Sequence, residues 1–172
     1  MVAADNYPRI MLSQIMNQQD INMLSRAIEL ARENVRNGGG PFGAVVTRDG
    51  VIVGEAVNQV IATPDPTAHA EVQAIRLAAK KLGTFDLTGC TLYSSCEPCP
   101  MCLGAVYWSR ISRVVYASDR SDAARAGFRD AQLYREMALD PARRAIPFDK
   151  MDLPGSGKEF NDWLQSTSRI DY

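Results

Sequence analysis

The sequence has a single histidine, His69, among 172 residues, so any chemistry that needs an imidazole must use it. The sequence also lacks an excess of either charge: 19 Lys plus Arg oppose 20 Asp plus Glu, a formal net charge of −1. A near-neutral chain with a pI of about 5.8 is unlike a dedicated nucleic-acid binder, which usually presents a basic surface. No apolar run approaches the roughly 18 residues that a membrane span needs.

A basic segment followed by an apolar stretch is missing from the start of the sequence. We therefore expect no secretory signal and a cytoplasmic location. In such a chain the four cysteines are expected as reduced thiols or metal ligands rather than as disulfides. Apolar residues make up 46% and charged residues 23%, which is a globular composition. The length fits a single domain over residues 1–172, with 1–19 as an N-terminal arm and 155–172 as a C-terminal segment.

Apolar residues at helical spacing and β-branched runs predict helices between strands after an opening hairpin. The strongest turn signal is Asp49-Gly50, between two β-branched runs. Asp20 and Thr67 are candidate N-caps. Strands are expected at 41–48, 51–57, 90–94 and 114–117, with a fifth short one at 147–151. Helices are expected at about 20–37, 67–82, 99–110, 122–139 and 158–165. This order predicts a three-layer α/β/α sandwich with a mixed central sheet of about five strands.

Two short motifs carry candidate metal ligands. A His-Ala-Glu motif begins at His69, and a Pro-Cys-Pro-Met-Cys motif contains Cys99 and Cys102. The two cysteines are three residues apart, so on a helix they share one face, near an N-terminus that lowers thiol pKa. If the two helices lie side by side, these three residues can bind one zinc ion and leave its fourth position to water. Glu71 is then close enough to move protons at that water.

Cys96 offers an alternative, because Cys96 and Cys99 form a second, overlapping Cys-x-x-Cys motif. As a fourth ligand, Cys96 would close the site and make it a structural zinc module without turnover. Pro100 favours a helix that starts near Cys99, so we expect Cys102 as the ligand and Cys96 as an accessory thiol. Cys99 and Cys102 could instead be a redox pair, but such a pair would not need the His-Ala-Glu motif.

Together the two motifs resemble the zinc-dependent cytidine deaminase superfamily. Five segments look more closely like the bacterial guanine deaminases of that superfamily, as does the terminal Tyr172: 40–45, 65–72, 95–105, 122–124 and 127–130. The resemblance implies a cytidine deaminase-like fold and one Zn²⁺ per subunit. It also implies hydrolysis of a free purine base, guanine to xanthine and ammonia, with Glu71 as the proton shuttle. A homodimer that exchanges its C-terminal segments is implied as well.

The resemblance also implies roles for residues outside the two motifs. Phe42 would line the base pocket, Asn58 would hydrogen-bond the purine, and the backbone N–H of Ala70 would meet a ring acceptor. Asp130 would act near the amino group as a second acidic residue. Tyr172 would reach into the active site of the other subunit.

Other observations leave the substrate open. Arg129 stands where members of this group often carry a further acidic residue, which adds a positive charge beside Asp130. Trp108 is a further candidate for substrate contact, with helix packing as its alternative. The competing activities are deamination of tRNA adenosine, which the neutral charge balance disfavours, or of another small base or nucleoside such as guanosine, cytosine or an aminotriazine.

Overall fold

The protein is described by a computed structural model over residues 16–171. Within that range, four strands form one mixed sheet in the order β2-β1-β3-β4. The strands are β1 (Gly43–Arg48), β2 (Val51–Val57), β3 (Cys90–Cys96) and β4 (Arg113–Ser118). β1 is antiparallel to both β2 and β3, whereas β3 and β4 are parallel. The predicted Asp49-Gly50 turn is confirmed: both residues have positive φ, 50° and 80°, as a tight hairpin between twisted strands requires.

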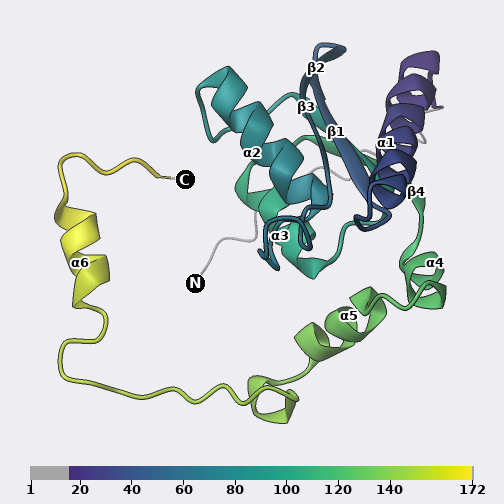
Figure 1. Cartoon of the computed structure of the whole chain (residues 1–172). Helices are drawn as coiled ribbons and strands as arrows, with labels where there is room; N and C mark the ends of the chain where they lie inside the picture. The colour runs from purple at the N-terminus through teal and green to yellow at the C-terminus, as the bar shows by residue number, and fades with distance from the viewer. Residues whose placement is uncertain (1–15, 172) are drawn as a thin grey trace.

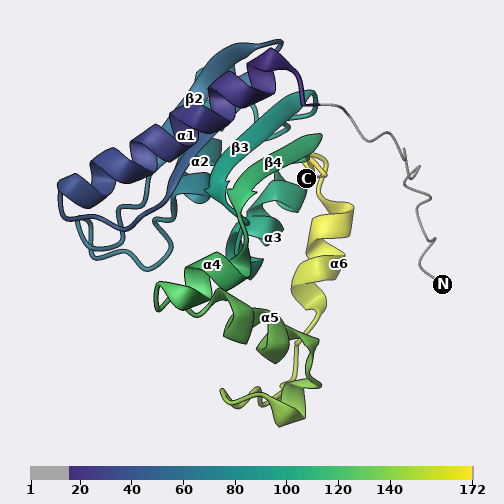
Figure 2. The ribbon, with the colours of Figure 1, turned by 90° about the vertical axis from the view of Figure 1, so that its right-hand side faces the viewer.

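Helices cover both faces of the sheet, as predicted (Figure 1). Helix α1 (Gln18–Arg36) lies on one face, and α2 (Ala70–Leu82) and α3 (Pro100–Trp108) lie on the other. Figure 2 shows α1 crossing in front of the strands. The expected three-layer α/β/α sandwich of the cytidine deaminase-like fold is therefore confirmed, with four strands rather than about five.

Alternation along the strands gives the sheet two apolar faces. Val46 and Leu92 pack towards α2 and α3, whereas Val45 and Tyr93 pack towards α1. The approach of α2 is especially close at Gly54, where a Cβ atom would lie 2.4 Å from the carbonyl oxygen of Ala74. This packing places the first turn of α2 over the edge of the sheet at which the site is built.

The expected fifth strand at 147–151 is not formed. In the described structure this segment has neither helix nor strand, and Phe148 and Met151 are exposed. Apolar content favours a strand, but a strand also needs a neighbour for its backbone hydrogen bonds. The segment follows α5 and runs away from the sheet (Figure 1).

The predicted helix at 122–139 is instead two helices, α4 (Arg120–Arg125) and α5 (Asp130–Ala138). Gly127 breaks it with a φ of +92°, a left-handed conformation that glycine adopts without steric cost. A short 3₁₀ turn, η1 (Pro141–Arg143), follows α5.

Two of the predicted N-caps are also wrong. Asn17 caps α1, and Asp20 occupies the third helical position, where it completes a capping box. His69, rather than Thr67, is the N-cap residue of α2.

The last helix, α6 (Lys158–Gln165), stands apart from the three layers (Figure 1). Its apolar residues Phe160 and Leu164 remain 68% and 64% exposed. Residues 144–157, which lead to it, contain no helix or strand. Among residues 16–171, no helix has the length and apolar character to cross a bilayer.

Candidate active site

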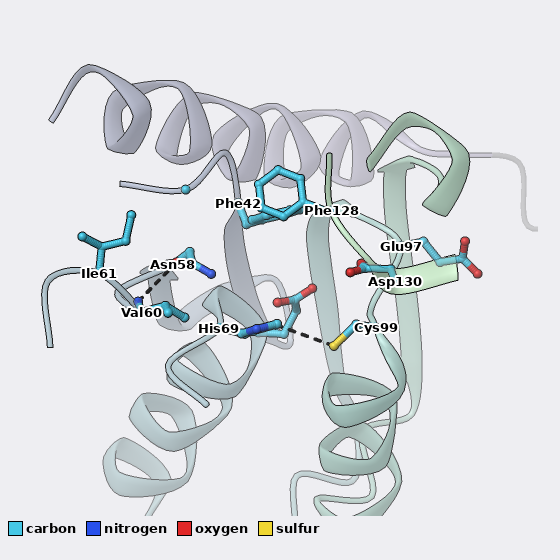
Figure 3. Close-up of a pocket in the computed structure, with 11 residues that line it drawn as sticks. Phe42, Asn58, Val60, Ile61, His69, Glu97, Cys99, Phe128 and Asp130 are labelled. Atoms are coloured by element: carbon cyan, nitrogen blue, oxygen red, sulfur yellow. Dashed lines mark hydrogen bonds between the residues drawn. The ribbon is translucent and has the colours of Figure 1, made fainter. Parts of the chain in front are cut away.

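A cavity of about 310 Å³ opens at the edge of the sheet where α2 and α3 begin (Figure 3). Its volume is in the range of small-molecule pockets. Parts of the chain far apart in sequence build its walls: the segment just before β1, the loop after β2, the first turn of α2, the loop after β3, and the turn that leads from α4 into the start of α5. The lining residues are Gly40, Phe42, Asn58, Val60, Ile61, His69, Glu71, Glu97, Cys99, Phe128 and Asp130.

Three candidate ligands meet at the floor of this pocket. His69 Nδ1 lies 3.6 Å from Cys99 Sγ and 3.5 Å from Cys102 Sγ, and the two sulfurs are 3.6 Å apart. Tetrahedral zinc would hold two sulfurs about 3.8 Å apart, and a sulfur and a nitrogen about 3.6 Å apart. The triangle therefore fits a zinc ion without rearrangement.

His69 and Cys99 are 30 residues apart in sequence, and their positions at the N-terminal ends of two neighbouring helices explain why they lie close together. His69 and Cys99 are the N-cap residues of α2 and α3, both with extended backbone, so their side chains project from neighbouring helix ends. Cys102 lies one turn into α3, on the same face as Cys99. Contact with the Cys102 thiol is the first cause, and contact with His69 a further one, that lowers the pKa of Cys99 well below its usual value. The same sulfur–sulfur contact, together with burial and the nearby Glu71 carboxylate, raises the pKa of Cys102.

Glu71 lies beside the ligand triangle and is only 4% exposed. Its Oε1 accepts a hydrogen bond from Ser94 Oγ at 3.1 Å, and its Oε2 lies 3.5 Å from Cys102 Sγ. Burial is the main reason why the pKa of this carboxyl is raised above its usual value. A buried carboxyl with a raised pKa, close to a metal site, is suited to accept and return protons.

The side walls carry the residues that the resemblance assigned to base binding. Phe42 forms an edge-to-face pair with Phe128, with ring centroids 4.7 Å apart. Asn58 and Asp130 lie on opposite sides of the pocket, above His69 and Cys99 (Figure 3). Burial raises the pKa of Asp130, and the nearby Cys99 adds to that effect. The pocket thus presents an amide on one side and a carboxyl on the other, beneath an aromatic pair.

The remaining predicted residues are Trp108, Ala70, Cys96 and Tyr172, and they differ in where they lie relative to the pocket. Trp108 ends α3, is 67% exposed and lines a separate hollow rather than the pocket that holds His69 and Cys99, and its contact with substrate stays a prediction. The rise of the helix puts Trp108 roughly 13.5 Å along α3 from the Cys99 cap. Ala70 is buried at the first position of α2, where N–H groups have no partner within the helix. Cys96 stands outside the ligand triangle, and its thiol donates to the carbonyl of Asp119 at 3.6 Å. The predicted site residue Tyr172 lies outside the described residues.

Sequence reasoning did not place Phe128, Glu97, Val60 or Ile61 at the site. Phe128 comes from a turn that the single predicted helix at 122–139 concealed. Glu97 lies in the loop between β3 and α3, next to Cys99. Its carboxylate points away from the pocket and forms an ion pair with Arg120, at 2.5 Å (Figure 3). The sequence signal that could have placed Glu97 at the site is its position two residues before the metal-ligand candidate Cys99.

A three-layer α/β/α domain in which a His/Cys/Cys triangle adjoins a buried glutamate is the arrangement of the zinc-dependent nucleobase deaminases. Residues 17–118 match the family described as the cytidine and deoxycytidylate deaminase zinc-binding region, and the chain belongs to that family. Zinc is accordingly the metal that His69, Cys99 and Cys102 are placed to bind.

Comparison with curated proteins and solved structures adds closer relatives. A guanine deaminase of Bacillus subtilis (strain 168) is 49% identical over 150 residues, 87% of this chain and 96% of that protein. The X-ray structure of the guanine deaminase from Bacillus subtilis superposes with a TM-score of 0.87 at 48% identity, covering 91% of this chain and 99% of that one. A tRNA-specific adenosine deaminase of Buchnera aphidicola is 43% identical over 103 residues, 60% of this chain and 64% of that protein.

Proposed function

We propose that this protein is a zinc-dependent guanine deaminase, which hydrolyses guanine to xanthine and ammonia. The oxygen of one water replaces the amino group on C2, and the nitrogen leaves as ammonia. When bound, zinc supplies a Lewis acid and lowers the pKa of water at the site to about 7. His69, Cys99 and Cys102 would hold it.

The remaining steps are assigned to side chains of the pocket. Glu71 takes a proton from the attacking water and passes it to the adjacent ring nitrogen, N3. A second proton, from Glu71 or Asp130, makes the amine a leaving group. Asn58 and the N–H of Ala70 would orient the purine.

The observation that carries this proposal is the carboxylate of Glu71 next to the ligand triangle, inside a pocket only 310 Å³ in volume. The extent of the likeness to the Bacillus subtilis guanine deaminase supports guanine over tRNA adenosine, because it reaches 87% of this chain rather than 60%. A pocket lined by Phe42 and Phe128 suits a flat aromatic base.

The test is ammonia release by zinc-loaded protein from a panel of substrates: guanine, guanosine, cytosine, an aminotriazine and a tRNA anticodon stem. We expect guanine to be turned over with the highest kcat/KM. The Asp130→Ala protein should retain zinc and lose most of that rate. Preferential turnover of the tRNA stem would overturn the proposal, and so would one zinc per chain without turnover of any substrate.

We also propose that the whole chain is one domain that works as a homodimer with exchanged C-terminal segments. Helix α6 supports this, because its apolar residues Phe160 and Leu164 are largely exposed and 14 residues without helix or strand, 144–157, separate it from η1. An exposed amphipathic helix on such a connection can pack on a second copy at little cost. Tyr172 would then act in the partner's site.

Complementation between two inactive variants tests the exchange. One variant lacks Tyr172 but keeps Glu71; the other is Glu71→Gln and keeps Tyr172. Co-refolded heterodimers should regain activity if Tyr172 is supplied across the dimer. A mixture that stays as inactive as its components, while light scattering confirms dimers, would contradict exchange.

The four cysteines are all unpaired and buried, which suits a reducing compartment. We therefore propose a cytoplasmic location and a role in purine breakdown. Thiol labelling of protein from lysed cells should find four reduced thiols per unfolded chain.

A further inference from the structure

Among the described residues, Ser94 is the one whose hydroxyl donates a recorded hydrogen bond to Glu71. It lies outside both the His-Ala-Glu and the Pro-Cys-Pro-Met-Cys motifs. Its Oγ lies 3.1 Å from Glu71 Oε1, and the residue is 1% exposed. β3 is a central strand, so the backbone of Ser94 is paired on both sides, with Ala44 of β1 and Tyr116 of β4. The hydroxyl is therefore carried by backbone that is hydrogen-bonded to a strand on each side.

The pattern of the strand makes this serine unusual. Alternate residues of β3 point to the α2/α3 face, and the two that precede Ser94 on that face, Cys90 and Leu92, are fully buried core residues. An apolar residue at position 94 would extend the same core. A hydroxyl there has to find a partner or leave a buried polar group unsatisfied, and its partner is the carboxylate of Glu71.

The contact also constrains the carboxylate. One oxygen of Glu71 accepts from Ser94, while the other faces Cys102 Sγ at 3.5 Å. A carboxylate that is fixed through one oxygen keeps the other directed at the ligand triangle. Without the hydroxyl, the end of the side chain could rotate about its last torsion, which has a broad energy minimum.

We propose that Ser94 is a positioning residue, whose hydroxyl holds the Glu71 carboxylate in the orientation that proton transfer requires. This inference rests on the proposed function for its kinetic consequence. It does not depend on which base is the substrate, because it concerns the geometry of Glu71 and the metal site alone.

Ser94→Thr and Ser94→Val test it as a pair. The two replacements have nearly the same shape, so they differ mainly in the hydroxyl. We expect Ser94→Thr to keep kcat within about threefold and Ser94→Val to lose about ten- to a hundredfold, with KM and zinc content unchanged in both. Equal kcat values for the two variants would overturn the proposal.

Ser109→Ala is the matched control for loss of a buried hydroxyl. Ser109 is 7% exposed and is the C-cap residue of α3, at the opposite end of that helix from Cys99, and its Oγ donates to the carbonyls of Ala105 and Val106. We expect this variant to lose some thermal stability and keep its kcat. A fall in kcat as large as that of Ser94→Val would mean that any buried hydroxyl has this effect.

Crystal structures of the zinc-loaded Thr and Val variants separate this inference from the proposed function. We expect Glu71 to keep its carboxylate orientation in Ser94→Thr and to change it in Ser94→Val. An unchanged Glu71 in both variants would overturn the positioning role even if guanine is the substrate. If wild-type protein fails to deaminate guanine, the proposed function is wrong. The orientation of the Glu71 carboxylate in the two variants still decides whether Ser94 is a positioning residue.

Discussion

Replacement of Asp20 by asparagine is expected to weaken the attachment of α1 to the sheet. Asp20 is only 2% exposed and accepts two hydrogen bonds from Arg113 of β4, at 2.6 and 3.0 Å. The hydroxyl of Tyr93 donates a third, at 2.8 Å. Asparagine keeps the size of the side chain but removes the charge that Arg113 faces.

The size of the effect follows from the pKa of Asp20, which is lowered from 3.8 to about 2, chiefly by the hydrogen bonds from Arg113. That shift corresponds to about 2 kcal/mol of stability at neutral pH. Because the pKa is lower in the folded than in the unfolded protein, this stability is present above about pH 4. It is lost as the pH falls towards about 2.

Urea unfolding of wild-type and Asp20→Asn protein at several pH values measures this effect. We expect Asp20→Asn to lower the free energy of unfolding by about 2 kcal/mol at pH 7, and the gap to shrink to about half near pH 3. Any change in zinc binding at low pH affects both proteins and cancels in the difference. Glu55→Gln is the control: its partner Arg26 also comes from α1, but both side chains are about a third exposed, so the loss should stay below about 1 kcal/mol. A gap that is the same at both pH values would refute the reasoning.

Four further changes probe the site and its support. Glu71→Gln should keep one zinc per chain and lose about 10²–10⁴-fold in kcat, measured by metal analysis and ammonia release. Cys102→Ser should release zinc to a chelator more readily than wild type, because a thiolate ligand is replaced by a hydroxyl; equal release would remove Cys102 from the ligand set. Gly54→Ala should destabilise by about 1–3 kcal/mol in urea unfolding, since its Cβ would meet the carbonyl oxygen of Ala74. Gly104→Ala, in open space inside α3, should be neutral or stabilising.

The chemistry of the site could be predicted from sequence because it depends on local signals. His69 and Cys99 each precede a helix, and helices that follow strands running in the same direction start at the same end of the sheet. β2 and β3 run in the same direction, because both are antiparallel to β1. The convergence of the His-Ala-Glu and Pro-Cys-Pro-Met-Cys motifs therefore follows from the order of strands and helices. The three-layer sandwich was predictable for the same reason.

The pocket walls could not be predicted in the same way, because they depend on long-range packing. Phe128 reaches Phe42 only because the chain turns at Gly127, and a glycine between two helical patterns does not specify the direction of the next helix. Asp20 shows the same limit: its cap-like sequence position was visible, but its bonds to Tyr93 and Arg113 join residues more than 70 apart. Local patterns carry no information about such pairs.

The choice between the two overlapping Cys-x-x-Cys motifs shows how secondary structure selects the ligands. Cys96 is the last residue of β3 and is buried, and burial raises the pKa of its thiol to about 11, which disfavours the thiolate that zinc needs. Cys99 instead caps α3, where unpaired N–H groups favour negative charge, and Cys102 follows one turn later on the same face. The residues between Cys96 and Cys99 turn the chain from strand to helix, so only the second motif has both sulfurs on one rigid element. A helix boundary, rather than the spacing of the cysteines, therefore separates a three-ligand catalytic site from a closed structural one.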